Sequence, residues 1–374
     1  MTGILLVAIS AQRHVGEIKC DDLQMTEREQ SPERILVTGG SGFVASHLIV
    51  QLLNAGYCVH TTIRKSSREQ QVRETIRHAG IDAGTRLIFF VTDLTKDDGW
   101  REALTGCKYV HHVASPFPAT IPKDENELIR PARDGTIRVL RLAREANVKR
   151  VIMTSSFAAI GYGHEHGQIP LFTESHWSVL DGRMSIPAYH KSKTLAEQSA
   201  WEFMRKEGGE LELAVINPTG VFGPVMGADF SSSIEIIKNM VNGNVPGCPR
   251  ISFGIVDVRD LADLHIRAMR SPAAQGQRFI GTCDNGPVAM MDIAKTLRAK
   301  RPQHAIRLPT KELPNWIVHA VALFRPGFRG ILPELGVVKR IDNTKAKDLL
   351  GWQPRSIEEC IVDTADSLVE YGIV

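Results

Sequence analysis

The sequence predicts an α/β protein in which a doubly wound parallel β-sheet is followed by a smaller α+β lobe. Between residues 34 and 216, short apolar runs alternate with stretches whose apolar residues recur at a helical period. This alternation is typical of a parallel sheet with helices on both faces, because the crossovers between its strands are right-handed. A glycine-rich turn follows the first apolar run, and the alternation ends at residue 217.

The elements follow from these patterns in chain order. Six strands are predicted in the alternating region, at residues 34–38, 58–63, 86–92, 109–114, 150–155 and 212–216. Between them, the helical period predicts helices at 43–54, 67–78, 98–104, 127–146 and 189–206. After residue 217, proline and glycine become frequent, and helices are predicted at 231–242, 258–270, 290–300 and 356–370. We expect the chain to return once to the sheet within residues 252–281.

The turn after the first strand has the spacing of a phosphate-binding loop. Gly39, Gly42 and Ala45 recur at every third position between an apolar run and an amphipathic helix. Residues without side chains let the backbone approach a pyrophosphate, and the N–H groups at the start of the helix point toward it. Small residues also let the helix pack closely on its strand. The turn therefore predicts a dinucleotide site, with an ordinary glycine-rich βα turn as the alternative.

Two further segments carry polar groups that suit carbonyl chemistry. Tyr189 and Lys193 are four residues apart, so on a helix they share one face. We expect the ammonium group of Lys193 to lower the pKa of the Tyr189 phenol, which then donates a proton to a carbonyl oxygen. An exposed surface pair is the alternative. Ser155 and Ser156 follow a predicted strand, where a hydroxyl reaches the cleft at the sheet edge, although a serine at such a place also commonly caps a helix.

Composition argues against several other classes of protein. The chain has 374 residues and a net charge of +3, which is too small to indicate nucleic-acid binding. No apolar run reaches the roughly 18 residues of a membrane span. The six cysteines are scattered without a CxxC pair, which fits reduced thiols. We therefore expect a cytoplasmic protein with no membrane or nucleic-acid partner and no metal, although His164-Glu165-His166 has a metal-like composition.

The first 32 residues differ from the rest of the chain. Residues 13–32 are charged and lack a clear period, so we predict that residues 1–32 are a poorly ordered extension. The run from Ile4 to Ile9 is apolar, but no Lys or Arg precedes it. A secretory leader is therefore the minor alternative.

Taken together, these motifs resemble the extended short-chain dehydrogenase/reductase family, and most closely its dihydroflavonol-reductase and aldehyde/ketone-reductase-like branch. The similarity covers residues 34 to 371. It rests on VTGGSGF at 37–43, HVASP at 112–116, AYHKSK at 188–193, NP at 217–218, VDVRD at 256–260 and DNTKA at 342–346. The resemblance implies a Rossmann-type, NADP-binding domain at 33–217 with parts of 252–281, and a substrate-binding lobe at 218–251 and 282–374.

The resemblance also implies roles for individual residues. Ser156 orients the substrate carbonyl, Tyr189 donates the proton, and Lys193 assists Tyr189 and holds the nicotinamide ribose. Ser155 takes the role of the serine if the register is shifted by one residue. The other residues implied in cofactor binding lie at the turn and at the strand ends: Thr38, Gly39, Gly42, Phe43, Val44, Asp93, Leu94, Val113, Ala114, Ser115, Pro218 and Thr219.

The residues after the second predicted strand bear on the choice of cofactor. An Asp or Glu there would bind the ribose 2′-hydroxyl of NAD, but the chain has Arg64, Lys65 and Arg68. A guanidinium group pairs with a phosphate through two hydrogen bonds. We therefore predict NADP(H), with Arg64 as the main contact of the 2′-phosphate and Lys65 or Arg68 assisting. A solvated basic loop is the alternative.

The predicted function is the NADPH-dependent reduction of aldehydes or ketones by a monomer or homodimer, with a small carbonyl compound as substrate. Phe172, Trp177 and the loop 222–226 are candidates for the substrate pocket or, equally, for the core. Two other functions stay open. One is that of a nucleotide-sugar epimerase or dehydratase, or of a steroid-dehydrogenase-like enzyme. The other is that of a module that senses NADP(H) without turnover.

Overall fold

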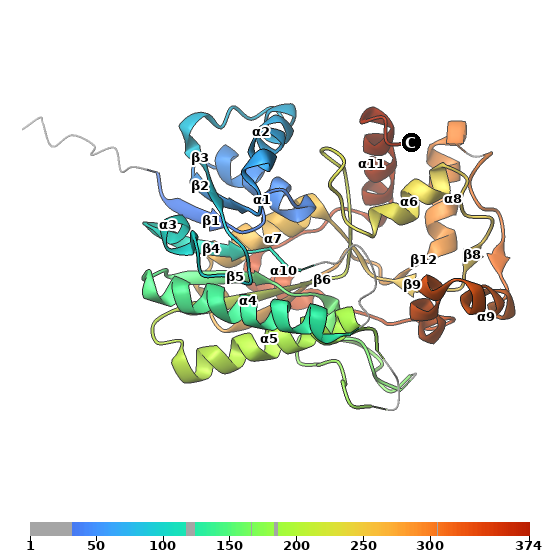
Figure 1. Cartoon of the computed structure of the whole chain (residues 1–374). Coiled ribbons are helices and arrows are strands. Elements are labelled where there is room, and N and C mark those ends of the chain that lie inside the picture. The colour runs from blue at the N-terminus through green and yellow to red at the C-terminus, as the bar shows by residue number, and fades with distance from the viewer. Residues whose placement is uncertain (1–31, 117–123, 166, 183–185, 305) are drawn as a thin grey trace, which may run out of the picture. The chain divides into compact units, whose positions relative to one another are not determined.

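Seven parallel strands form the central sheet (Figure 1). The computed structural model describes residues 32–116, 124–165, 167–182, 186–304 and 306–374, so residues 1–31 of the predicted extension lie outside it. The strand order is β3-β2-β1-β4-β5-β6-β11, and all neighbours are parallel. The strands are β1 (Arg34–Val37), β2 (Cys58–Ile63), β3 (Leu87–Val91), β4 (Cys107–His112), β5 (Arg150–Thr154), β6 (Glu212–Pro218) and β11 (Gln277–Gly281).

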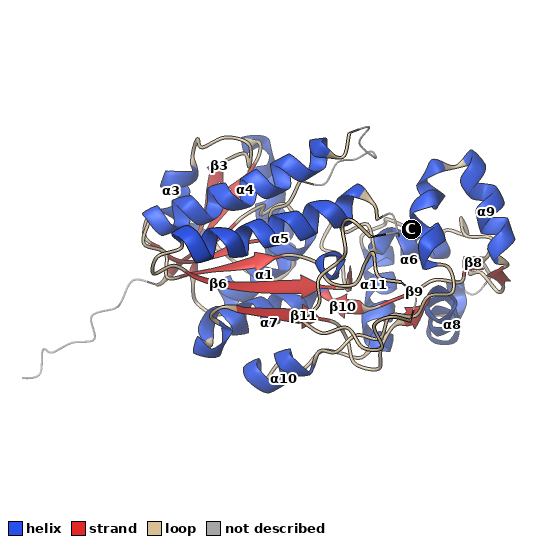
Figure 2. Ribbon diagram, turned by 90° about the horizontal axis from the view of Figure 1, so that it is seen from below, coloured by secondary structure: helices blue, strands red, loops and turns tan. Residues whose placement is uncertain are grey.

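Helices cover both faces of this sheet (Figure 2). Successive side chains of a strand point to opposite faces. Ile35 and Val37 accordingly belong to one core cluster, and Leu36 belongs to another. The first cluster includes residues of α1 (Phe43–Asn54), α2 (Glu69–His78), α7 (Val258–Arg270) and α10 (Thr344–Leu350). The second includes residues of α3 (Trp100–Leu104), α4 (Asn126–Glu145) and α5 (Ala188–Glu207). The predicted doubly wound, Rossmann-type class is confirmed.

A smaller lobe lies beside the carboxyl ends of the strands (Figure 2). Its core is shared by α6 (Ile234–Val241), α8 (Met290–Lys300) and α11 (Ile357–Glu370). Next to them, α9 (Asn315–Phe324) packs on the 3₁₀ helix η7 (Pro326–Glu334). Three pairs of short strands complete the lobe: β7 (Gly220–Phe222) with β10 (Ile255–Asp257), β9 (Ser252–Phe253) with β12 (Val288–Ala289), and β8 (Cys248–Pro249) with β13 (Glu312–Leu313).

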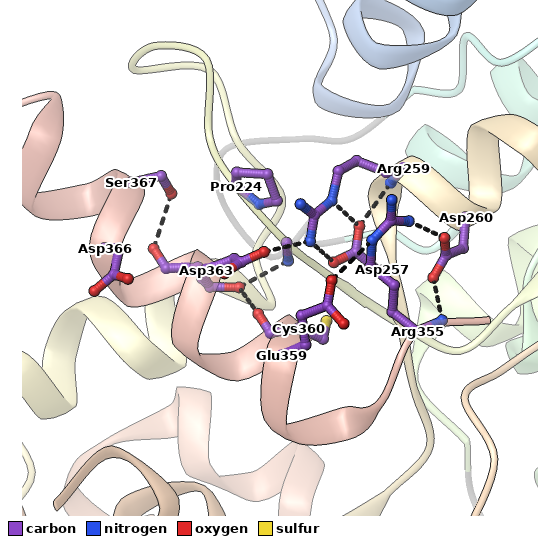
Figure 3. A network of polar contacts seen from close by, with 12 residues as sticks. Pro224, Asp257, Arg259, Asp260, Arg355, Glu359, Cys360, Asp363, Asp366 and Ser367 are labelled. Carbon is purple, nitrogen blue, oxygen red and sulfur yellow. Dashed lines mark hydrogen bonds and ion pairs between the residues drawn. The ribbon is translucent and has the colours of Figure 1, made fainter. Parts of the chain in front are cut away.

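A network of ion pairs joins α11 to the start of α7 (Figure 3). Arg259 binds the two carboxylate oxygens of Asp257 at 2.9 and 2.7 Å, and it binds Asp363 of α11 at 2.6 Å. Arg355, just before α11, pairs with Asp260 of α7. The C-terminal helix is therefore held by charges as well as by its apolar face.

The loop after β7 is tied at two places. Thr364 and Ser367 of α11 accept hydrogen bonds from two backbone N–H groups of the loop, at 2.7 and 2.8 Å. Further along, Asp229 forms an ion pair with Arg68 and accepts a hydrogen bond from Gln71 of α2 at 2.8 Å. The loop thus links the C-terminal helix to the helix that follows β2.

All six predicted strands and nine predicted helices occur, with ends shifted by a few residues. The seventh strand, β11, lies in the region where the chain was expected to return to the sheet. The sequence patterns did not predict α9, α10, η7 or the short strand pairs. The domain boundary at residue 217 stays a prediction. No helix in the described ranges is both long and apolar enough to cross a membrane.

Candidate cofactor and active-site cleft

A cleft of about 640 Å³ opens at the carboxyl ends of the central strands. Ligands of doubly wound sheets bind at this edge, where the strand order reverses, and here the order reverses between β1 and β4. Most of the predicted site residues line this cleft: Gly39, Gly42, Phe43, Val44, Arg64, Asp93, Leu94, Val113, Ala114, Ser115, Ser156, Tyr189, Lys193, Pro218 and Thr219.

Thr38, at the end of β1, is buried beneath the turn. Its Oγ1 accepts hydrogen bonds from the backbone N–H groups of Val113 and Ala114, at 3.0 and 2.9 Å. These bonds tie the end of β1 to the end of β4, the two strands between which the order reverses. Thr38 therefore supports the cleft from below and does not line it.

The turn contains glycines for two different reasons. Gly39 has a φ of +74°, and a Cβ there would lie 3.1 Å from the Cβ of Ala114. Gly40 has no room for a side chain, because a Cβ would lie 2.1 Å from Oγ1 of Thr61 on β2. The spacing in the sequence identified Gly39 and Gly42 as residues of the turn that must be small. It did not identify Gly40, because the residue that excludes a side chain there belongs to a neighbouring strand. Helix α1 begins after Gly42 without a side-chain cap, so no side chain of the described residues binds its first N–H groups.

The basic residues after β2 have three different surroundings. Arg64 is exposed and lines the cleft. Lys65 is exposed but is not part of the cleft lining. The charge of Arg68 already has a partner in Asp229. Of the three predicted contacts of a 2′-phosphate, the structure places only Arg64 at the cleft.

Ser156 meets Tyr189 and Lys193 in this cleft, although it lies 33 residues before Tyr189 in the sequence. Tyr189 and Lys193 lie one turn apart near the start of α5, and the Tyr189 hydroxyl is hydrogen-bonded to the Ser156 hydroxyl. Ser156 Oγ also accepts a hydrogen bond from the N–H of Ala158 at 3.1 Å, at the start of the 3₁₀ helix η4 (Phe157–Ala159). The backbone thus fixes the serine beside the phenol.

Burial has opposite effects on the pKa values of Tyr189 and Lys193. It raises the pKa of the Tyr189 phenol, and the hydrogen bond with Ser156 offsets this rise only in part. It lowers the pKa of Lys193 to about 8, against the attraction of Glu197. The expected lowering of the phenol pKa by Lys193 is therefore wrong here, because removal from water disfavours the phenolate more strongly than its surroundings favour it.

Glu197 lies one turn beyond Lys193 on α5 and is completely buried. Its carboxylate accepts hydrogen bonds from Ser155 at 2.5 Å, from Asn217 at 2.7 Å and from Arg278 at 2.6 Å. The network joins α5 to the residue after β5, to β6 and to β11. Ser155 therefore gives its hydroxyl to Glu197, which leaves the following serine to contact the phenol.

A second cavity, of about 300 Å³, adjoins the start of α5, and Ser233 lines both spaces. The ring of His190 contacts two tyrosine rings, and its centroid lies 4.0 Å from that of Tyr162 and 5.7 Å from that of Tyr189. Lys339 Nζ lies 3.8 Å from the centroid of the Tyr162 ring. Most of the remaining wall is apolar: Ile186, Ile236, Ile251, Phe253, Ile331 and Val337. No sequence motif connects the segments that line this cavity.

Of the other candidate residues, His164 lines the second cavity, whereas Phe172, Phe222 and Trp177 are not among the residues that line either cavity. Phe172 and Phe222 are buried in the core, which was the alternative for them. Trp177 packs against the guanidinium group of Arg278, whose central carbon lies 3.8 Å from the centroid of the indole. His166 lies outside the described residues. Among the residues that are described, no group of His, Cys, Asp and Glu is arranged to hold a metal ion.

The chain is similar in sequence and in fold to proteins of known activity. The model of the NAD dependent epimerase/dehydratase family matches residues 35–280. A ketoreductase of Aspergillus niger is 31% identical, over 91% of this chain and 98% of that protein. Dihydroflavonol 4-reductase of Gerbera hybrida is 34% identical, over 80% of this chain and 82% of that protein. The solved structure of yeast methylglyoxal/isovaleraldehyde reductase complexed with NADPH gives a TM-score of 0.74 at 27% identity, over 91% of this chain and 100% of that chain.

Proposed function

This chain belongs to the NAD dependent epimerase/dehydratase family, and we propose that within this family it is an NADPH-dependent reductase of aldehydes or ketones. The resemblance to extended short-chain dehydrogenases/reductases is thereby confirmed. The names of its ketoreductase and dihydroflavonol 4-reductase relatives support a reductase. The observation that carries the proposal is the meeting of Ser156, Tyr189 and Lys193 in the cleft that also contains the glycine-rich turn.

The residues of the cleft suit a dinucleotide that carries a 2′-phosphate. Gly39 and Gly42 let the backbone approach the pyrophosphate, and the uncapped first turn of α1 supplies N–H groups for it. Arg64 supplies the charge for the 2′-phosphate. The yeast reductase that superposes on this chain was solved with NADPH. When bound, the cofactor supplies the hydride that the carbonyl carbon receives.

Tyr189 supplies the proton that the carbonyl oxygen needs. Because burial raises its pKa, the phenol stays protonated at neutral pH, which is the form required of a proton donor. Ser156 binds the same carbonyl oxygen and holds the phenol through their shared hydrogen bond. Lys193 stabilises the phenolate that remains after the transfer, and its charge is largely lost as the pH rises through about 8.

The second cavity is the proposed place for the rest of the substrate. It adjoins the start of α5 and is lined by His190, the residue after Tyr189. When the carbonyl group of the substrate lies at Tyr189, a substituent on the carbonyl carbon can occupy this largely apolar cavity. Sites for small molecules usually combine such a wall with a few polar groups, and here Lys339 and Glu334 are among them.

The test is turnover of NADPH by the purified protein and by its Tyr189→Phe variant. A panel of aldehydes, α-diketones, ketoesters and flavonoid-like ketones is screened by the loss of NADPH absorbance. The variant loses the proton donor, so we expect kcat to fall by about 10²–10⁴-fold. The Kd of NADPH, measured by fluorescence titration, should change by less than about threefold, because the phenylalanine keeps the ring.

Three results would contradict the proposal or favour an alternative. Full activity of Tyr189→Phe would exclude the proposed proton donor. A tenfold preference for NADH, or purification with tightly retained NAD, would favour an epimerase-type reaction. Tight NADPH binding without oxidation of NADPH by any carbonyl compound of the panel would favour a sensor of the cofactor.

A further inference from the structure

Helix α9 exposes large apolar side chains on the side away from its packing partner. Val318 and Ala322 are buried, and α9 packs against η7. In contrast, Trp316, Leu323 and Phe324 are 71%, 72% and 85% exposed. Their spacing places these three side chains on one face of the helix, opposite the buried pair. The helix is therefore apolar on both sides, and one side lacks a cover in the described structure.

This exposure is concentrated in one segment. Eleven large apolar side chains are exposed among the described residues, and five of them lie between residues 306 and 328. Scattered apolar residues are normal on a surface, whereas a cluster marks an interaction site. Both views place α9 at the outer end of the lobe, away from the central sheet (Figures 1 and 2). We call residues 306–329 the α9 surface.

The α9 surface is also basic. Within the described part of the chain, no ion pair engages its four exposed basic side chains, and its single acidic residue, Glu312, pairs with Arg250. A symmetric dimer through this surface would bring the basic groups of two copies together, and like charges across an interface are unfavourable. The charge therefore favours an anionic partner. The four basic residues are Arg307, Lys311, Arg325 and Arg329.

We propose that the α9 surface binds the protein to an anionic lipid bilayer. Trp316, Leu323 and Phe324 project from α9, and the four basic side chains lie in the segments that flank this helix. Apolar side chains that enter the bilayer interface about 5–10 Å deep, with Lys and Arg beside them, bind anionic membranes. Tryptophan is enriched at the level of the headgroups. These three side chains are 71–85% exposed, and apolar side chains that project so far from a helix suit insertion between lipids. The expectation of no membrane partner rested on the lack of a spanning run, which a surface helix does not need.

The test is flotation of the full-length protein with lipid vesicles. Vesicles of phosphatidylcholine with one quarter phosphatidylserine are compared with vesicles of phosphatidylcholine alone. We expect binding to the anionic vesicles, and a loss of about fivefold for each of the four basic residues changed to Gln. The triple variant Trp316→Ser, Leu323→Ser, Phe324→Ser should lose at least about tenfold, because it removes the inserted apolar area.

A matched control removes three exposed apolar side chains elsewhere: Val91→Ser, Leu171→Ser and Val369→Ser. It should float like the unchanged protein, and thermal melting checks that each variant folds. All variants keep residues 1–31, so a difference in binding comes from the substituted side chains. The readout is independent of catalysis and therefore of the proposed function.

The proposal is wrong if the unchanged protein does not float with anionic vesicles. It is also wrong if the α9 triple variant floats like the control, or if only the charge variants lose binding, which would indicate a simple polyanion site. A dimer in solution that the triple variant dissociates, without vesicle binding, would instead assign this surface to a second copy of the chain.

Discussion

The side chain of Arg64 decides the proposed preference between the two nicotinamide cofactors. We expect Arg64→Gln to raise the KM for NADPH by about 10–100-fold, because a charge-assisted hydrogen bond contributes about 1.5–3 kcal/mol. The KM for NADH should change by less than about threefold, since NADH has no 2′-phosphate. Steady-state kinetics with each cofactor measures both values.

Lys65 gives a matched control for this substitution. It is the next residue along, it is also exposed, and it is not among the residues that line the cleft. Lys65→Gln should therefore leave the ratio of the two KM values nearly unchanged. Equal effects of the two substitutions would mean that general positive charge, and not a contact of Arg64, attracts the phosphate.

At the scale of residues, the sequence predicted which residues lie at the site better than it predicted the pKa values and packing roles of these residues. The one-turn spacing of Tyr189 and Lys193 placed both at the cleft, because helical geometry is local. The direction of the Tyr189 pKa was wrong, since it depends on burial by segments that are far away in the sequence. The roles of Thr38 and Gly40 also depend on segments that are far away in the sequence. Thr38 accepts hydrogen bonds from residues after β4, and Gly40 packs against β2.

At the scale of elements, α5 carries three ionisable groups on one face, and its Glu197 favours the charged form of Lys193. Carbonyl reduction should therefore fall as the pH rises through about 8, where Lys193 loses its proton. Glu197→Gln removes the attraction, so the pKa of Lys193 falls and the alkaline limb of kcat/KM moves to lower pH. We expect the rate at pH 8, relative to the same variant at pH 6.5, to fall by about 3–10-fold.

Glu202 lies further along α5, is exposed and pairs with Lys206 at 2.6 Å. Glu202→Gln should leave the pH profile unchanged, so it separates the effect of the buried carboxylate from that of net charge. If the alkaline limb of the kcat/KM profile is at the same pH in Glu197→Gln as in the unchanged protein, Glu197 does not affect the pKa of Lys193. Because each rate is compared with that of the same variant, a general loss of activity does not affect the result.

The turn between β1 and α1 depends on a close approach to β2. Gly40→Ala should destabilise the protein by about 1–3 kcal/mol, because its Cβ would overlap Oγ1 of Thr61. Gly42→Ala should cost less, since its φ of −85° suits alanine, but it should weaken cofactor binding. Thermal melting and cofactor titration separate the two effects. If the added Thr61→Ala does not restore part of the stability of Gly40→Ala, the overlap is not the cause.

The sequence predicted regular elements well where one periodicity dominates. The residues of α4, for example, follow the helical period closely, with a buried apolar face along the whole helix. The helix α9 was missed because its sequence, NWIVHAVALF, is apolar on nearly all sides and has no helical stripe of polar residues. The strand β11 was located only as part of a region, because its five residues, QRFIG, mix polar and apolar side chains without a clear alternation.

At the scale of the whole molecule, buried histidines make the stability depend on pH. Burial lowers the pKa of His47 and His190 to about 4 and that of His112 and His265 to about 3. In the unfolded chain their pKa lies near 6.5, so below that pH the unfolded state binds protons that the native state does not. Each such histidine should cost about 1.4 kcal/mol of stability per pH unit below 6.5. Thermal melting between pH 7 and 5.5 should show the decline.

Single substitutions test this origin of the pH dependence. His47 Nε2 is hydrogen-bonded to the carbonyl of Pro224 at 2.9 Å, and the amide of His47→Gln keeps a donor for it. This variant should lose stability less steeply as the pH falls. His78 is exposed, and His78→Gln should leave the slope unchanged. Equal slopes in both variants would assign the acid sensitivity to other groups.

The position of β11 in the chain has a consequence for synthesis on the ribosome. Residues 277–281 pair with β6, and they emerge only after β7, β10 and the helices between β6 and β11 have been made. Until then a nascent chain presents β6 as an open edge, and such edges template aggregation. Premature termination before residue 277 should therefore yield insoluble fragments, and the nascent protein should depend on chaperones most strongly over this stretch of translation.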